Sequence, residues 1–258
     1  MMRNLARPTR LSDPGGDFVD EEELRSILAT PDQQMAFYEF NCLFQGRLPA
    51  GTYGEVIYFF PMMMNYLLEE RDGWDTLFIN VMVWLNEYAE ELRNDGRWEA
   101  TLERLNAQTE AKINAPFRLR RYTDKHHDSR FWPNGIDWFW ALDDAIDTCQ
   151  SIYEETCPVL AGTEALLLKR FEAITSYDAA AWFVYLTKQC PHLPCLKQLG
   201  AEGDRMARAE ALIVEETLRN PLHLRFWDRE LALTINNPLL IVYKKWYTMH
   251  FLERTIEL

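Results

Sequence analysis

Acidic side chains near the middle of the chain have a spacing that metal chemistry uses. Asp143 and Asp144 precede Asp147 in the string DDAID, so the first and last carboxylates lie one helical turn apart. Carboxylate oxygens at such spacing can hold Mg²⁺, and Mg²⁺ in turn binds the oxygens of phosphates. One hypothesis is therefore a metal-dependent enzyme that acts on a diphosphate or a phosphate ester.

A helical projection favours a different role for these carboxylates. The pattern predicts a helix over residues 136–153 whose buried stripe contains Phe139, Leu142 and Ile146. At about 100° per residue, Asp144 points nearly away from this stripe. The remaining acidic residues lie on its flank or close to the flank, and they are Asp143, Asp147 and Glu154. We therefore expect a solvated acidic face in place of inward-facing metal ligands.

Trp140 falls on the same acidic face of this helix. A large ring surrounded by charges is typical of a binding hot spot, because the ring is desolvated while the charges steer a basic partner. Alternatively, another segment of the chain covers the ring and supplies counter-charges from within. The cations best placed for that second role are Arg118, Arg120 and Arg121. The sequence leaves both interpretations open.

Two enzyme families share parts of these patterns. The DDAID string resembles the aspartate-rich motif of the all-α isoprenoid synthases, but their second motif is only approximated around Asn94 and Asp95, with Trp98 where a hydroxyl ligand belongs. His126, His127 and Asp128 resemble the His-Asp doublet of all-α metal phosphohydrolases. That family needs a further histidine earlier in the chain, and none precedes this pair. We expect a loop at this doublet and no bound metal or cofactor. The basic cluster of Arg118, Arg120, Arg121, His126 and His127 is a candidate either for contacts with acidic helices of the same chain or for binding a small anion.

Composition limits the remaining classes of function. The net charge is −13, which repels nucleic acid and anionic membrane surfaces and attracts cationic partners. The five cysteines are an odd number in a chain too large to need disulfides, and the opening residues lack the apolar core of a signal peptide. The longest apolar run is too short to span a bilayer. We expect a cytoplasmic protein with free thiols and a protein partner.

Helical periodicity dominates the chain and predicts an all-α fold. Residues 1–19 read as a flexible arm, and residues 20–258 as one irregular bundle of roughly ten helices, with 116–135 as a connecting stretch. Capping patterns mark two helix starts, at Asp20 with Glu23 and at Thr52 with Glu55. Pro61 should kink the helix that follows Thr52 or end its first segment. We find no alternating pattern of a half-buried strand.

The segment from Pro49 to Tyr53, together with Glu55, the pair Tyr58-Phe59 and Pro61, resembles a pattern in bacterial immunity proteins, which protect against secreted antibacterial toxins. The resemblance covers about fifteen residues. It implies a cytoplasmic protein without enzymatic activity that binds a cognate toxin domain and occludes it. It assigns no contact residues, so the predicted binding surface rests on the acidic face around Trp140.

Overall fold

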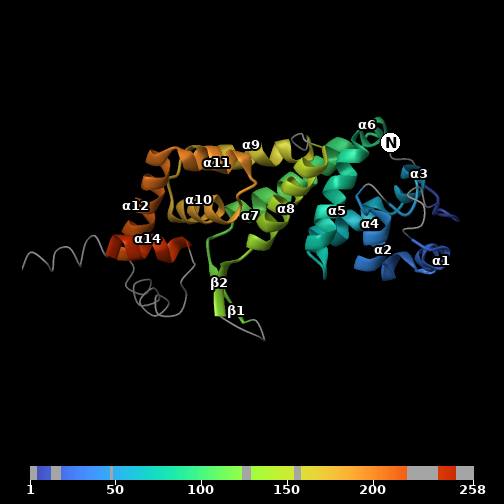
Figure 1. Cartoon of the computed structure of the whole chain (residues 1–258), viewed down its shortest axis with the longest axis horizontal. Coiled ribbons are helices and arrows are strands. Elements are labelled where there is room, and N and C mark those ends of the chain that lie inside the picture. Colours follow the sequence, from blue (N-terminus) through green and yellow to red (C-terminus); the bar gives the residue numbers. More distant parts are fainter. Residues whose placement is uncertain are drawn as a thin grey trace, which may run out of the picture. The chain divides into compact units, whose positions relative to one another are not determined.

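Helices make up nearly all the regular structure of the computed structural model (Figure 1). The structure describes residues 5–12, 19–46, 49–123, 129–153, 158–219 and 238–247. These residues contain thirteen α-helices, two short 3-10 helices and a single antiparallel pair of strands. The all-α prediction is thus confirmed.

The chain divides into two compact units. Unit 1 comprises residues 1–109 and 141–163, and unit 2 comprises residues 110–140 and 164–258. The helices of unit 1 are α1 (Glu21–Ala29), η1 (Asp32–Gln34), α2 (Phe37–Leu43), α3 (Tyr53–Val56), α4 (Phe60–Leu68), α5 (Trp74–Glu87), α6 (Ala89–Asn94) and η2 (Pro158–Leu160). Two long helices, α7 (Trp98–Asn114) and α8 (Ile136–Tyr153), contribute residues to both units. The single domain over 20–258 stays a prediction.

Unit 2 holds the remaining elements. They are β1 (Leu119–Thr123), β2 (Ser129–Pro133), α9 (Ala161–Glu172, whose first residues belong to unit 1), α10 (Tyr177–Gln189), α11 (Pro194–Ala201), α12 (Gly203–Arg219) and α14 (Pro238–Tyr247). The two strands form a hairpin inside the stretch 116–135, which the sequence predicts to be a plain connection. The expectation of no strand is therefore wrong at this place.

Both predicted capping patterns mark true helix starts. The Asp20 side chain accepts a hydrogen bond from the Glu23 amide at 2.8 Å, and Glu23 accepts one from the Asp20 amide. The Glu55 carboxylate accepts one from the Thr52 amide at 2.8 Å. Pro61 ends the first segment after Thr52, because α3 stops at Val56 and the proline lies in the first turn of α4, where a missing N–H costs nothing.

Unit 1 is packed around Trp84, which is fully buried on α5. Its ring lies 5.0 Å from that of Phe44, edge to face, and 5.0 Å from that of Tyr88. Phe60 and Tyr53 close the cluster at 5.7 and 6.0 Å, and Tyr53 is stacked. The indole N–H of Trp84 has no hydrogen-bond partner among the described residues. Its role is thus to fill volume between helices.

In unit 2 the buried tryptophan at the centre of α10 is Trp182. Its ring contacts those of Phe117 and Phe139, each at 5.3 Å, and its indole N–H donates to the Ala115 carbonyl at 3.1 Å. Every residue of α10 from 179 to 186 is buried, as expected of a helix that is apolar all round and enclosed by its neighbours. Helices α12, α14 and α11 pack against it.

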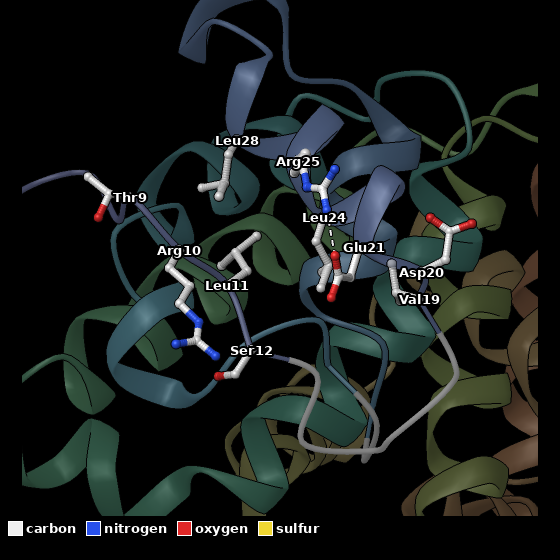
Figure 2. A pocket seen from close by; sticks show the side chains of 10 residues that line it. All are labelled: Thr9, Arg10, Leu11, Ser12, Val19, Asp20, Glu21, Leu24, Arg25 and Leu28. Carbon is white, nitrogen blue, oxygen red and sulfur yellow. Dashed lines mark hydrogen bonds and ion pairs between the residues drawn. The ribbon is translucent and has the colours of Figure 1, made fainter.

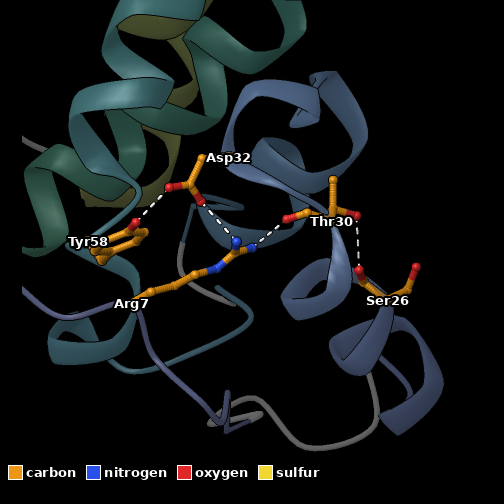
Figure 3. A network of polar contacts seen from close by, with 5 residues as sticks. All are labelled: Arg7, Ser26, Thr30, Asp32 and Tyr58. Atoms are coloured by element: carbon orange, nitrogen blue, oxygen red, sulfur yellow. Dashed lines mark hydrogen bonds and ion pairs between the residues drawn. The ribbon is translucent and has the colours of Figure 1, made fainter.

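Residues 5–12 have no regular structure but are fastened to unit 1 (Figure 3). Arg7 forms an ion pair with Asp32 at 3.0 Å and donates to the Thr30 carbonyl at 2.5 Å. Tyr58 donates to the second oxygen of Asp32 at 2.6 Å. The Arg7 guanidinium also lies over the Phe59 ring. The sequence predicts a flexible arm over residues 1–19. Within it, residues 5–12 are instead attached to unit 1 by these contacts.

A second fastening joins the same segment to the start of α3. Glu55 accepts hydrogen bonds from the hydroxyl of Ser12 at 2.6 Å and from the Ser12 amide at 3.1 Å. Burial raises the pKa of Glu55, but the hydrogen bonds from Ser12 and Thr52 outweigh it, so the net pKa lies below the usual value of 4.5. The ionised carboxylate is therefore the form that the fold stabilises.

Four thiols are buried, two in each unit: Cys42 and Cys149 in unit 1, Cys190 and Cys195 in unit 2. None of these four forms a disulfide, as the sequence predicts, and the fifth cysteine, Cys157, lies outside the described residues. Burial raises the pKa of the Cys195 thiol to about 12 and also raises that of Cys42. Because the thiolate is the reactive form, Cys42 and Cys195 are chemically quiet in the folded protein.

Gly51 and Gly54 provide a matched pair of substitutions. Gly51 has φ +129°, and a Cβ there would meet Val56 at 2.8 Å, whereas a Cβ at Gly54 in α3 meets nothing. We predict that Gly51→Ala lowers the free energy of unfolding by about 2 kcal/mol or more, because strain and overlap add. Gly54→Ala should raise it by about 0.5 kcal/mol. Urea denaturation measures both, and equal effects would contradict the described geometry.

Glu55→Gln tests the fastening at Ser12. Because the pKa of Glu55 is lowered on folding, its stabilisation is present above the unfolded value and is lost as the pH falls through the lower folded value. We predict that Glu55→Gln costs about 1 kcal/mol at neutral pH and that the loss shrinks below about pH 4. Unfolding free energies measured across pH check this. Glu99→Gln, at an exposed position of α7, is the control and should leave the profile unchanged.

Candidate functional site

The hairpin brings the basic stretch and the tryptophans together in unit 2. β1 and β2 pair antiparallel in a register that sets Arg120 opposite Trp132 and Leu119 opposite Pro133. The Asn134 amide donates to the Arg118 carbonyl at 2.8 Å and closes the base of the hairpin directly before α8. The predicted candidates His126 and His127 lie outside the described residues, as does the side chain of Arg121, although its backbone belongs to β1.

Trp132 and Trp140 form an edge-to-face pair at the base of the hairpin. Their ring centroids are 4.6 Å apart with an interplanar angle of 86°. Both side chains are half-buried, so part of each ring remains open to solvent. The expectation that another segment could cover Trp140 is thus partly met, and the covering group is a second tryptophan. A pair in this geometry gains about 1 kcal/mol beyond its buried area.

The hairpin and the first turns of α8 also carry charged side chains. Arg118 and Arg120 at the hairpin are exposed, and neither forms an ion pair or a hydrogen bond through its guanidinium with any residue that the structure describes. On α8, Asp137 is exposed in the turn before Trp140. We call Arg118, Arg120, Trp132, Asp137 and Trp140 the tryptophan surface. It combines aromatic area with free cations and one carboxylate.

The acidic face predicted for α8 continues from Trp140 along the same helix. Asp144 and Asp147 are exposed, as the helical projection predicts. Four and seven residues from Trp140, they lie within about 40° of it around the helix axis. Asp143 departs from the projection, since only 4% of it is exposed. It therefore does not belong to the solvated face. Glu154 lies outside the described residues.

The aspartate string does not present a common ligand set. Asp143 is buried, whereas Asp144 and Asp147 face solvent, so the three carboxylates do not converge on one enclosed point. In the described part of the chain, no three side chains of His, Cys, Asp and Glu are grouped so that they could hold a metal ion. Within the same part, every helix is too short or too polar to cross a bilayer. The hypothesis of a phosphate-directed enzyme has no geometric support at this motif.

Trp132 and Asp137 are members of the surface that the sequence reasoning does not single out. A signal for Trp132 exists in hindsight, because the segments LRRYT and SRFWP flank a polar turn and each can form a short strand. Neither strand alternates cleanly between apolar and polar residues, since arginine and aromatic residues are interleaved. The contact of Trp132 with Trp140 depends on the register of that hairpin, which the pattern alone does not specify.

Comparisons with protein-family models, with curated proteins and with solved structures found no significant match. The resemblance of the segment beginning at Pro49 to immunity proteins therefore stays a prediction. The structure does show what these residues do in the fold. Tyr53 stacks on Trp84 and donates to Asp95, while Glu55 and Tyr58 hold the N-terminal segment.

A double-mutant cycle on Trp132 and Trp140 tests the geometry of the surface. We predict that Trp132→Ala and Trp140→Ala together cost less than the sum of the single losses, with a coupling of about 1 kcal/mol, because each ring loses the same contact. Unfolding free energies in urea give the four values. A cycle on Trp132 and Trp74, a half-buried tryptophan of unit 1, should show no coupling. Additive losses for Trp132 and Trp140 would contradict the contact.

Proposed function

We propose that this chain acts by binding a protein partner through the tryptophan surface and the acidic face of α8. The observation that carries the proposal is the half-buried pair Trp132 and Trp140, in the same unit as Arg118 and Arg120, whose guanidinium groups pair with no described residue. Hot spots at interfaces are enriched in tryptophan and arginine, and they gain most when a partly exposed ring becomes fully desolvated. The Trp132 contact holds the Trp140 ring in place before binding, which reduces the entropy lost on association.

The charge of the chain supports a basic partner. A net charge of −13 accelerates the approach of a cationic domain, and the exposed carboxylates of Asp144 and Asp147, which follow Trp140 in the sequence of α8, add to this attraction. Arg118 and Arg120 can pair with carboxylates of the partner and fix its orientation, since the guanidinium binds carboxylates in a bidentate geometry. The partner should therefore be basic overall, with acidic residues at the edge of its contact surface.

The specific form of this proposal is an immunity-type inhibitor. The resemblance of the segment beginning at Pro49 implies such a protein, and occlusion of a toxin's cationic cleft needs a surface with these properties. Inhibition would come from steric blocking, so the chain itself would carry out no chemical step. Charge would set a fast association rate, and the buried rings a slow dissociation rate.

The experiment begins with partner capture by the intact chain from the native host, followed by binding kinetics with the purified partner. We predict that Trp140→Ala weakens the Kd by about thirtyfold, mainly through faster dissociation, because the central ring is lost. Asp144→Lys should slow association severalfold, and the effect should diminish in high salt. Asp144 is exposed, so its substitution leaves the folded core intact.

Glu99→Lys changes the net charge by the same amount at another exposed site and is the matched control. It should lower the association rate less than Asp144→Lys does. Thermal unfolding of every variant separates lost binding from lost folding. If the captured partner binds Trp140→Ala and Asp144→Lys with the affinity of the parent chain, the assignment of this surface is wrong. If the partner binds this chain but keeps its full activity in the complex, the inhibitor form of the proposal is wrong.

A further inference from the structure

A groove in unit 1 lies between the N-terminal segment and α1, far along the sequence from the tryptophan surface. Residues Thr9–Ser12 form one side of the groove (Figure 2). The other side is formed by Val19 and Asp20 together with four residues of α1, which are Glu21, Leu24, Arg25 and Leu28. The pocket has a volume of about 900 Å³. Pockets that bind small molecules fall in the range of roughly 300–1,000 Å³, so this groove is large enough for an organic ligand.

The floor of the groove is apolar. Leu11, Val19 and Leu24 are buried, and Leu28 is half-buried near the end of α1. Figure 2 shows the side chains of Leu11, Leu24 and Leu28 lying between the two segments. The floor is fixed in place because the N-terminal segment is fastened on both sides of it, at Arg7 and at Ser12. An apolar chain entering the groove would therefore meet a preformed surface.

Of the charged side chains that line the groove, Asp20, Glu21 and Arg25 already have partners in unit 1, whereas Arg10 has none among the described residues. The Asp20 carboxylate caps α1 by accepting from the Glu23 amide, and Glu21 is paired with Arg25 at 2.5 Å. Arg10 is exposed, and no hydrogen bond or ion pair joins it to any described residue. The Arg10 guanidinium is therefore available to a ligand, as far as the described part of the chain is concerned. A ligand with an anionic group complements this rim.

We propose that the N-terminal groove binds a small amphipathic carboxylate, with its apolar chain on Leu11, Leu24 and Leu28 and its carboxylate on Arg10. The guanidinium can bind a carboxylate through two parallel hydrogen bonds. The acidity of the whole chain does not oppose this, because charges more than about 8 Å away are largely screened at physiological ionic strength. The two carboxylates that line the groove are already engaged with α1 itself.

Sodium octanoate is the probe, titrated into the full chain below its micelle concentration and followed by calorimetry and by methyl NMR shifts of leucine. Saturable binding at one site is expected, with shifts at Leu11, Leu24 and Leu28. Hexanoate should bind about tenfold more weakly, because two fewer methylenes are buried. Octanol, which has the chain without the charge, should also bind about tenfold more weakly than octanoate.

Variants separate this site from general hydrophobic uptake. Arg10→Ala should weaken octanoate about tenfold and leave octanol unchanged, whereas Leu28→Gln should weaken both. Arg208→Ala removes another exposed arginine, on α12, that has no hydrogen bond or ion pair with any described residue, and it is the matched control that should change nothing. Absence of saturable binding, or binding that is indifferent to both Arg10→Ala and Leu28→Gln, overturns the proposal. Equal affinity for octanol and octanoate overturns the role of Arg10.

Discussion

The packing of large aromatic rings between helices is the constraint on which both units depend. Trp84 in unit 1 and Trp182 in unit 2 are fully buried, and each is surrounded by further rings. Because a core is packed as densely as an organic crystal, such a ring fixes the spacing of every helix that touches it. A short helix such as α3 could not persist alone, and the stacking of Tyr53 on Trp84 holds it in place.

The same constraint explains which parts of the fold the sequence predicts well. Apolar stripes at helical spacing and the capping patterns at Asp20 and Thr52 are local signals, and each identifies a helix that the structure contains. The effect of Pro61 is also local. The hairpin at residues 119–133 escapes prediction because a two-stranded ribbon is marginal by itself and because arginine and aromatic residues interleave in its sequence without a clean alternation. Its stability comes from the contact of Trp132 with α8, which lies beyond its own pattern.

The candidate site shows the same limit more sharply. A helical projection assigns exposure by angle, and it succeeds for Asp144, which points well away from the stripe, and for Asp147 on its flank. It fails for Asp143 because burial at the flank of a stripe depends on which neighbours pack there. The groove beside α1 is likewise invisible in the sequence, since it arises from the fastening of Arg7 and Ser12 to residues more than twenty positions away. Local rules predict elements, whereas sites arise from how the elements meet.

The distribution of buried thiols has a practical consequence. Cys42 and Cys149 lie in unit 1, and Cys190 and Cys195 in unit 2, all of them enclosed. A thiol reagent can reach such a group only when its surroundings open, so the rate of alkylation at each cysteine reports the opening free energy of that region. Each unit thus contains two cysteines whose alkylation rates report its opening. Mass spectrometry of the modified peptides would reveal whether the two units unfold together or one after the other.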